Sequence, residues 1–299
     1  MDNITLENEM LKVVIIPGRG GKVVSLRRKD LNFEFAAQTG GDIKPATDDS
    51  KFGDYDISGI DDAFPNIDCE KISYGGHLLS YPDHGEIWSH NMKIISTSSE
   101  AAALTFDSTR FGYHYEKTVE INNDILEVKY LIRNEGRNVL PCFWTFHGLF
   151  AFRKDAKIVY PSDVAFVKNV LNGTPLGDYG KVFPVNGTID FSSLSYACIN
   201  EPCMMKYYAT NRIEEGTCGI IYPSDRAGID ITYDAMKLPW LGVWITAGGL
   251  AGDYNMALEM TNGYYDSISN AMKNKRILMM KPGEDIQFTI SLHTITMPK

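Results

Sequence analysis

The chain has 299 residues, 44% of them hydrophobic, and a formal net charge of −9. A chain of this length buries roughly three quarters of its unfolded surface, so its core needs no metal or disulfide for stability. The acidic balance argues against nucleic acid as a partner, because no basic stripe offsets it. Length alone fits either two average domains or one large all-β domain.

Cysteine usage and the first residues indicate the compartment. The five cysteines are odd in number and include no Cys-x-x-Cys pair, which favours free thiols in a reducing cytoplasm. Residues 1–7 are acidic and lack the basic and apolar parts of a signal peptide. No apolar run approaches the roughly 20 residues of a membrane-spanning helix. We therefore expect a soluble cytoplasmic protein with no membrane partner.

Alternation of apolar and polar residues recurs along the whole chain and predicts β-strands. In the last of these strands, Ile286, Phe288, Ile290 and Leu292 face one way and the polar residues between them face the other. The other predicted strands cover residues 12–16, 22–27, 92–97, 102–106, 115–121, 125–134, 157–160, 219–222, 229–233, 241–246 and 276–280.

A helical period occurs in one segment, residues 264–275, where Ile268 and Met272 lie four apart. Many short strands with almost no helix predict an all-β protein, built as an antiparallel sandwich or barrel. No internal repeat, low-complexity tract or boundary divides the chain. We therefore expect one domain over residues 1–299.

Two polar segments are expected at the surface. Residues 37–68 are rich in Gly, Asp and Pro, which predicts a long surface loop that contains the adjacent Asp61 and Asp62. Loops of this length in compact domains are commonly functional. A short basic cluster is expected to form a solvated strand face and turn; it comprises Arg19, Lys22, Arg27, Arg28 and Lys29.

The most apolar stretch of the chain, residues 142–150, contains one ionisable side chain, His147. Neither alternate set of its side chains is polar, which predicts a strand buried on both faces. A buried histidine needs a hydrogen-bonding partner, since an unsatisfied polar group costs about 1–3 kcal/mol. This segment alone is equally consistent with a satisfied core histidine and with a catalytic one.

Glu259 is the single charged residue of another apolar strand, residues 255–260. Glutamate is almost never fully buried unless it is paired. Burial would raise its pKa from about 4.3 towards neutrality, where a general base works best. The alternative is an exposed strand face, which Ala257 and Thr261 would permit. We favour the functional interpretation.

His84 lies between Pro82-Asp83 and Gly85, so its imidazole is expected at a shaped turn and not within a strand. An ordinary surface histidine is the alternative. No metal site is expected from Asp83, His84 and His90, because the spacing of the two histidines fits no standard ligand pattern. The nearby Trp88 is either a flat platform for the C–H face of a sugar or a core residue.

Four segments in this order and spacing resemble the aldose 1-epimerase (galactose mutarotase) superfamily: residues 82–88, 144–150, 258–263 and 281–284. Residues 18–26 and 61–65 also fit. The resemblance spans nearly the whole chain. It implies a single-domain, antiparallel β-supersandwich, all-β, with a sugar bound in a cleft across one sheet.

The resemblance also implies a mechanism for interconverting the α and β anomers of a sugar. His147 matches the acid that protonates the ring oxygen, Glu259 matches the base that deprotonates the anomeric hydroxyl, and His84 matches a histidine that assists at the ring oxygen. The ring opens, the aldehyde rotates, and closure from the other face gives the other anomer. One acid and one base on opposite sides of C1 suit this step. It needs no metal or organic cofactor.

The substrate is less well defined by the sequence. The Asn-Arg pair that well-known members carry before the first histidine motif is missing, and Gly148 replaces a usual proline. The residues predicted to bind the sugar are Trp88, Trp144, Asp61, Asp62, Arg110 and Lys206.

Two alternatives to a mutarotase for free sugars keep the same fold. One is a carbohydrate-binding protein without catalysis. The other is a mutarotase for phosphorylated sugars, for which Arg19, Arg110 and Lys206 are the scattered basic candidates. Exposed strand edges could pair two subunits into an oligomer.

Overall fold

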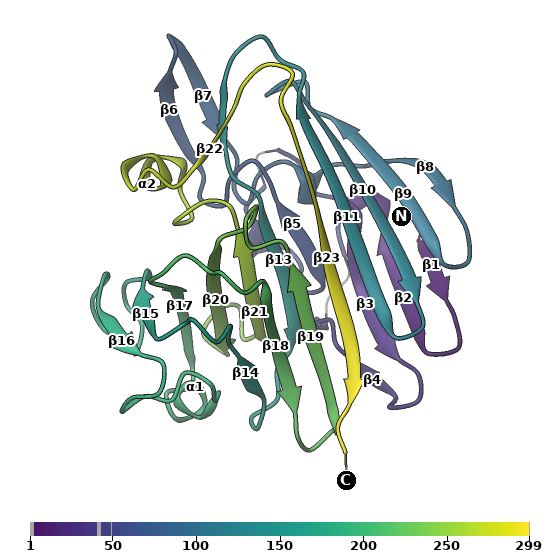
Figure 1. Ribbon diagram of the computed structural model, residues 1–299, viewed down its shortest axis with the longest axis vertical. Helices are drawn as coiled ribbons and strands as arrows, with labels where there is room; N and C mark the ends of the chain where they lie inside the picture. Colours follow the sequence, from purple (N-terminus) through teal and green to yellow (C-terminus); the bar gives the residue numbers. More distant parts are fainter. Residues whose placement is uncertain (1–2, 41–42, 49, 299) are drawn as a thin grey trace.

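A computed structural model describes residues 3–40, 43–48 and 50–298. Two large antiparallel β-sheets dominate the molecule and pack face to face (Figure 1). The predicted all-β antiparallel class is therefore confirmed. No helix within these three ranges is both long enough and apolar enough to cross a membrane.

The first sheet contains eleven strands among the described residues, with β4 (Phe33–Glu34) attached beside β3. The spatial order of the other strands is β1 (Ile4–Glu7), β2 (Leu11–Ile16), β3 (Lys22–Arg28), β5 (Ile60–Ala63), β13 (Thr145–Ala151), β21 (Tyr254–Thr261), β20 (Trp240–Ala247), β17 (Cys203–Ala209), β15 (Phe166–Asn169) and β16 (Val182–Pro184). This sheet carries the candidate site on the face turned away from the second sheet.

The second sheet has eight strands in the described part of the chain. Their order is β14 (Lys157–Val159), β18 (Thr217–Tyr222), β19 (Ala227–Tyr233), β23 (Asp285–Thr296), β11 (Ile125–Asn134), β10 (Tyr113–Asn122), β9 (Ala101–Asp107) and β8 (Lys93–Thr97). Along β23 the buried side chains alternate as predicted, with Phe288, Ile290 and Leu292 in the core.

The remaining elements are short. Two strand pairs stand apart from the large sheets: β6 (Glu70–Tyr74) with β7 (His77–Tyr81), and β12 (Leu140–Cys142) with β22 (Leu278–Met280). The helices are α1 (Ser195–Ile199) and α2 (Ile268–Lys273), with 3₁₀ turns η1 (Pro17–Arg19), η2 (Phe52–Asp54) and η3 (Ile87–Ser89). The helix predicted over residues 264–275 is thus confined to its middle, where Ser267 caps the first turn by accepting a hydrogen bond from the Asn270 N–H.

Strand β13 is buried on both faces, as its composition predicts. Phe146 and Phe150 join the large core between the two sheets. Leu149, on the opposite face, packs in a smaller apolar cluster with Phe52 and Trp88. Phe52, which lies between β4 and β5, therefore covers the outer face of the sheet in this region.

The prediction that residues 37–68 form a surface loop is wrong for their second half. Residues 60–63 form β5, which lies between β3 and β13, and both Asp61 and Asp62 are buried. Asp62 Oδ2 accepts a hydrogen bond from Lys117 Nζ at 2.6 Å, and its Oδ1 accepts one from the Tyr130 hydroxyl at 2.7 Å. Ion pairing within the fold thus lets these acidic residues occupy a central strand.

The solvated face predicted for the basic cluster is also wrong at three of its five positions. Arg19, Lys22 and Arg28 are buried. Arg19 Nη1 lies 2.6 Å from Asp56 Oδ1, while Lys22 Nζ pairs with Asp56 and lies 3.2 Å from Asp61 Oδ2. These carboxylates come from later in the chain, and no local pattern indicates that they would meet the cations.

Candidate active site

A row of polar side chains crosses the outer face of the first sheet, perpendicular to its strands. Asp61 of β5 is paired with His147 of β13. The register of β13 with β21 brings Glu259 alongside His147, and Glu259 is paired with Gly242 of β20. Three segments that are far apart in the sequence thus meet because their strands are neighbours.

Above this row lies a cavity of about 210 Å³. This volume is below the roughly 300–1,000 Å³ of sites for drug-sized ligands, so the cavity suits a smaller molecule. Its lining includes Phe52, Gly53, Ile57, Ile67, Asp68, His84, His147, Leu149, Leu171, Lys206, Trp244, Leu250, Glu259 and Asp266. The structure therefore brings together His84, His147, Glu259 and Lys206, four of the residues predicted for the site.

Glu259 and His147 face one another on the floor of this cavity. His147 Nε2 lies 4.0 Å from Glu259 Oε1, and both side chains are buried. Among the described residues, His147 Nδ1 and Glu259 Oε1 have no hydrogen-bond partner. Buried polar atoms are seldom left unpaired in native structures, and such groups in a cavity are free to bind a ligand.

Burial moves the pKa values of these two groups towards each other. Burial raises the pKa of Glu259 above its ordinary value, although the charge of Lys206 partly offsets this effect. Burial lowers the pKa of His147 well below its ordinary value, and the positive charges of His84, Lys206 and Lys22 lower it further. A carboxyl group and an imidazole with converging pKa values suit general acid–base catalysis.

His84 lies in a turn, as its neighbours in the sequence predict, with a left-handed φ of 57°. Asp83 Oδ1 lies 2.9 Å from His84 Nδ1. The His84 ring stacks on Phe52 with 4.4 Å between centroids and meets the His147 ring edge-on at 4.9 Å. Strained backbone conformations of this kind are concentrated at functional sites.

Asp83 fixes the orientation of the His84 ring. Burial alone would raise the pKa of Asp83, but the hydrogen bond and charge of His84 outweigh burial and lower it. Because Asp83 is therefore an acceptor, His84 Nδ1 carries the hydrogen of their bond. Asp83 Oδ2 also accepts a hydrogen bond from the Phe52 N–H at 2.8 Å, which holds Phe52 beside the two histidines.

Lys206 joins the proposed base to a second carboxylate. Its Nζ lies 2.9 Å from Glu259 Oε2 and 3.1 Å from Asp266 Oδ2. Burial alone would lower the pKa of Lys206, but Asp266 and Glu259 reverse this effect and raise it above its ordinary value. Lys206 is therefore a fixed cation at the floor of the cavity.

Five of the residues predicted to bind a sugar are not among the residues that line this cavity. Trp144 is fully buried between the sheets, where its Nε1 donates to the Tyr115 hydroxyl at 3.0 Å. Trp88 is a core residue under Phe52, and Arg110 pairs with Asp48 at 2.9 Å outside the cavity. Asp61 and Asp62 are engaged by Lys22 and Lys117, as described above.

Of the lining residues that were not predicted from the sequence, four are aromatic or acidic: Phe52, Asp68, Trp244 and Asp266. Trp244 lies two residues from Gly242 on β20, so both residues are on the same face of that strand, and Gly242 is paired with Glu259. Once this pairing is known, Trp244 can be predicted to lie near Glu259. Phe52 and Asp68 lie outside the strands of the large sheets, where no periodicity indicates their direction. Asp266 lies just before α2, so the helical period of residues 264–275 does not indicate its direction.

Asp68 and Asp266 make the cavity mouth acidic. Asp68 is exposed, yet desolvation by the surrounding atoms and the neighbouring Asp266 carboxylate raise its pKa to about 6. The Asp68 N–H also donates to the Asp266 main-chain oxygen at 2.9 Å.

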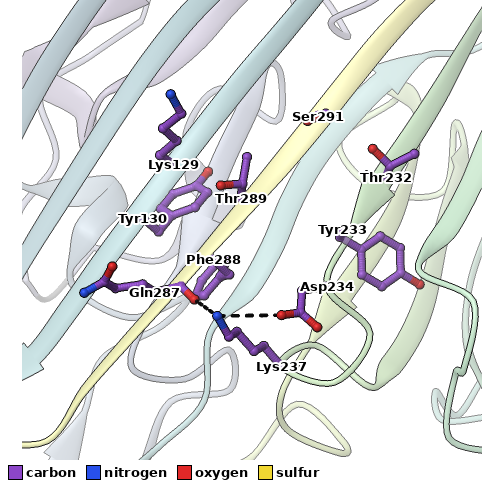
Figure 2. A pocket seen from close by; sticks show the side chains of 10 residues that line it. All are labelled: Lys129, Tyr130, Thr232, Tyr233, Asp234, Lys237, Gln287, Phe288, Thr289 and Ser291. Carbon is purple, nitrogen blue, oxygen red and sulfur yellow. Dashed lines mark hydrogen bonds and ion pairs between the residues drawn. The ribbon is translucent and has the colours of Figure 1, made fainter.

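Two hollows of more than twice the volume of this cavity lack an acid–base pair. One, of about 560 Å³, lies along β11, β19 and β23, where Lys237 Nζ donates to the Gln287 main-chain oxygen at 2.6 Å (Figure 2). Its described lining contains neither a histidine nor a buried carboxylate. The other, of about 800 Å³ beside β7, has no carboxylate among its described lining residues.

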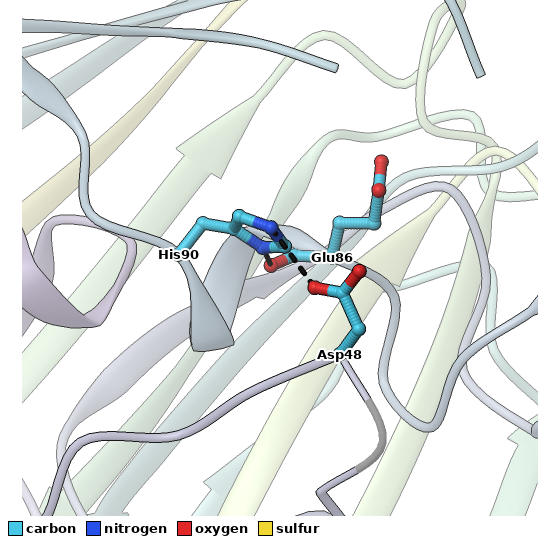
Figure 3. Close-up of side chains that lie close together, drawn as sticks. All are labelled: Asp48, Glu86 and His90. Atoms are coloured by element: carbon cyan, nitrogen blue, oxygen red, sulfur yellow. Dashed lines mark hydrogen bonds and ion pairs between the residues drawn. The ribbon is translucent and has the colours of Figure 1, made fainter. Parts of the chain in front are cut away.

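Asp48, Glu86 and His90 form the one cluster of described residues with the composition of a metal site (Figure 3). His90 Nε2 lies 2.9 Å from Asp48 Oδ1, and Nδ1 lies 2.8 Å from the Glu86 main-chain oxygen. Arg110 already pairs with Asp48, and the Glu86 carboxylate accepts a hydrogen bond from Ser108 at 2.6 Å. These contacts explain the cluster as an ion-pair network.

Comparison with solved structures shows which known fold the chain shares. Neither a protein-family model nor a curated protein sequence matches the chain. A solved structure of a protein from Synechocystis sp. PCC 6803 matches at a TM-score of 0.75 and 16% identity, over 99% of this chain and 96% of that one. A galactose mutarotase related enzyme from Lactobacillus acidophilus matches at a TM-score of 0.73 and 14% identity, over 100% and 99% of the two chains.

The chain has the galactose mutarotase-like fold. A galactose mutarotase-like protein from Lactobacillus casei agrees, with a TM-score of 0.73 and 16% identity over 98% of this chain and 100% of that one. The β-supersandwich implied by the sequence motifs is therefore confirmed. At these identities the galactose mutarotase-like fold is what the chains share, so the chemistry has to be argued from the cavity itself.

Proposed function

We propose that this protein is an aldose 1-epimerase, or mutarotase, that interconverts the α and β anomers of a free aldose or sugar derivative. One observation carries the proposal. A buried carboxylate and a buried imidazole, Glu259 and His147, lie 4.0 Å apart on the floor of a small cavity, and polar atoms of both lack a partner among the described residues.

The geometry suits the two oxygens that react. In a cyclic aldose the anomeric hydroxyl and the ring oxygen are both bonded to C1, so a base and an acid on neighbouring strands can reach them together. Glu259 takes the proton of the C1 hydroxyl while His147 protonates the ring oxygen. The C1–O5 bond breaks, its electron pair goes to O5, and a C1 carbonyl forms.

Ring closure reverses these proton transfers. The free aldehyde rotates about the C1–C2 bond, His147 removes the proton from the O5 hydroxyl, and Glu259 returns its proton to the C1 oxygen. Each cycle therefore restores both groups to their starting states. His84 lies beside His147 and supports the ring-oxygen side, with its own ring fixed by Asp83.

The cavity lining supports binding of an uncharged sugar. Phe52 and Trp244 offer apolar faces, while Asp68, Lys206 and Asp266 can bind hydroxyl groups. Three lining carboxylates, Asp68, Glu259 and Asp266, outnumber the single lining lysine among the described residues. A phosphorylated sugar would meet net negative charge there, so we favour neutral sugars.

The test is polarimetry of freshly dissolved single anomers from a panel of aldoses that includes glucose and galactose. Wild-type protein is expected to accelerate the approach to equilibrium for at least one aldose, with little activity on glucose 6-phosphate. Glu259→Gln and His147→Ala are each expected to lower that rate by about 10²–10⁴-fold, the usual contribution of a general acid or base.

Two results would contradict the proposal. A wild-type rate equal to buffer for every aldose in the panel would exclude mutarotase activity on them. If, in addition, calorimetry detected sugar binding that survived Glu259→Gln, the protein would be a carbohydrate-binding protein with the same fold.

A further inference from the structure

Lys206 has a position that the anomer-exchange mechanism does not by itself require. It is the single lysine or arginine among the described residues that line the cavity, and it is buried. Its Nζ bridges Glu259 Oε2 at 2.9 Å and Asp266 Oδ2 at 3.1 Å. Isolated buried cations are costly, so this lysine depends on the two carboxylates.

Asp266 is itself held firmly in place. Its Oδ1 accepts a hydrogen bond from the Tyr208 hydroxyl at 2.6 Å. Its main-chain oxygen accepts hydrogen bonds from the N–H groups of Ile67 at 3.2 Å and Asp68 at 2.9 Å. Contacts from β17 and from the segment after β5 therefore fix Asp266, which in turn fixes the Lys206 ammonium.

Room for the Glu259 carboxylate comes from Gly242 on the adjacent strand. A Cβ at Gly242 would lie 3.2 Å from Glu259 Oε2 and 2.9 Å from the Tyr208 ring. The carboxylate can thus turn towards β17, where Lys206 meets it. With Oε2 paired to Lys206, Oε1 is left on the side of His147 and the cavity.

Glu259 has few other sources of stabilisation for its charge. The titratable and charged groups near it come from four parts of the fold and are His147, His84, Lys206, Tyr208, Asp68 and Asp266. His147 is 4.0 Å away and disfavours its own charged form, and the two aspartates repel a carboxylate. Lys206 is the nearest cation, and without it a carboxylate this deeply buried would take up a proton.

We propose that Lys206, braced by Asp266, is a positioning residue that keeps Glu259 ionised and directs its free oxygen into the cavity. The catalytic meaning of this role rests on the proposed function, while the electrostatic coupling between the three residues does not. Lys206 contacts the proposed base and acts through it.

The direct test is the titration of Glu259 in the full-length protein, followed by the ¹³C shift of its side-chain carboxyl. Selective ¹³C labelling of glutamate and the difference from Glu259→Gln identify the signal. Lys206→Met keeps the apolar stem but removes the charge, and is expected to raise the midpoint by about 1–3 pH units. Lys206→Arg is expected to keep it within about half a unit of wild type, because it restores the charge.

The activity profile gives a second readout. At a pH one unit below the new midpoint, Lys206→Met is expected to lose about tenfold in kcat, and to recover as the pH rises, because the base becomes ionised. A merely structural role would give a loss that higher pH does not rescue. Lys168→Met is the matched control, since Lys168 lies on the neighbouring β15 and bonds to Tyr265 outside the cavity.

A second variant tests the proposal if Lys206→Met fails to fold, because it is expected to shift the Glu259 midpoint in the opposite direction. Asp266→Asn removes a repelling carboxylate and retains an acceptor for Lys206, so the Glu259 midpoint is expected to fall. An unchanged midpoint in either variant would overturn the positioning role. A shifted midpoint in a wild-type protein that exchanges no anomers would support the positioning role and contradict the proposed function.

Discussion

Glu259 and His147 lose contact with water together, yet burial favours opposite changes in their charge. The carboxyl group is easier to protonate than in water, and the imidazole is harder to protonate. Ring opening requires a carboxylate and an imidazolium at the same time. The fraction of molecules in this state therefore depends strongly on pH.

We predict a bell-shaped pH profile for kcat/KM with its maximum below pH 6.5. The acid limb follows Glu259, whose pKa is raised above 4.5, and activity is lost as the pH falls through it. The basic limb follows His147, whose pKa is lowered well below 6.5, and activity is lost as the pH rises through it. Initial rates of anomer exchange between pH 4 and pH 9 measure both limbs.

Variants assign the two limbs. Residual activity in Glu259→Gln should lack the acid limb, and residual activity in His147→Asn should lack the basic limb. A wild-type rate that stays constant from pH 6.5 to pH 9 would show that protonated His147 is not the acid.

Single residues also show what the sequence can predict at this scale. Glu259 and His147 are recognisable because each is the sole ionisable group in an apolar run, and the structure buries both. Trp144 lies in an equally apolar run, whereas Trp88 has polar neighbours such as Glu86 and Ser89. In both cases an aromatic ring gives no sign of whether it faces a core or a cavity. Both rings are buried and neither lines the cavity. The catalytic roles of Glu259 and His147 stay predictions.

At the scale of elements, β20 links the proposed base to the lysine on β17. Its Gly242 lies between them and supplies space instead of a side chain. Strand β20 therefore sets how closely the carboxylate can approach β17. Small changes in such spacing are costly, because a displacement of about 1 Å in a catalytic group can reduce a rate about 100-fold.

We predict that Gly242→Ala lowers kcat/KM by about tenfold or more and destabilises the fold by about 1–3 kcal/mol through overpacking. The added Cβ would meet the Tyr208 ring at 2.9 Å, so ring and carboxylate must both move. Polarimetry and urea denaturation measure the two effects.

Gly40→Ala is the matched control, because its Cβ would meet no heavy atom within 4 Å. Both its rate and its stability should equal those of wild type. Wild-type kcat/KM in Gly242→Ala would refute the idea that space at this position controls the base.

Most strands were predictable because alternation is a local property. The predicted strand at 125–134 coincides with β11, and most of the others differ from the structure by one or two residues at their ends. Strand β5 was missed because its Asp61-Asp62 pair resembles a loop. Its stability in the sheet comes from Lys22 and Lys117, which lie far away in the sequence.

At the scale of the whole molecule, one ion pair joins the two sheets through the apolar core. Asp62 on β5 of the first sheet binds Lys117 on β10 and Tyr130 on β11 of the second. The next residue, Asp61, faces the opposite side of β5, beside His147. The contact between sheets therefore also fixes the strand that borders the candidate site.

We predict that Asp62→Ala lowers the free energy of unfolding by about 3–5 kcal/mol, because it leaves the Lys117 ammonium buried without its partner. Urea denaturation followed by fluorescence measures the change. Asp285→Ala, which removes a partly exposed carboxylate 3.9 Å from Arg133, should change stability by less than about 1 kcal/mol. Equal losses in both variants would contradict a special role for the buried pair.

Assembly of the site is the feature that the sequence predicts least. His84, His147 and Glu259 lie far apart in the chain, and only the order of neighbouring strands brings the last two side by side. Asp266 reaches the cavity from the residues just before α2, and Phe52 from a segment without periodicity, so neither could be identified before the fold was known.

The most direct test of the central claim is NMR exchange at chemical equilibrium, by saturation transfer between the α and β anomer signals of each aldose in a panel. For at least one aldose, the exchange rate should rise in proportion to wild-type protein. Glu259→Gln should reduce that increase by about 10²–10⁴-fold. Exchange at the buffer rate for every aldose, or full activity in Glu259→Gln, would contradict the assignment of this cavity to anomer interconversion.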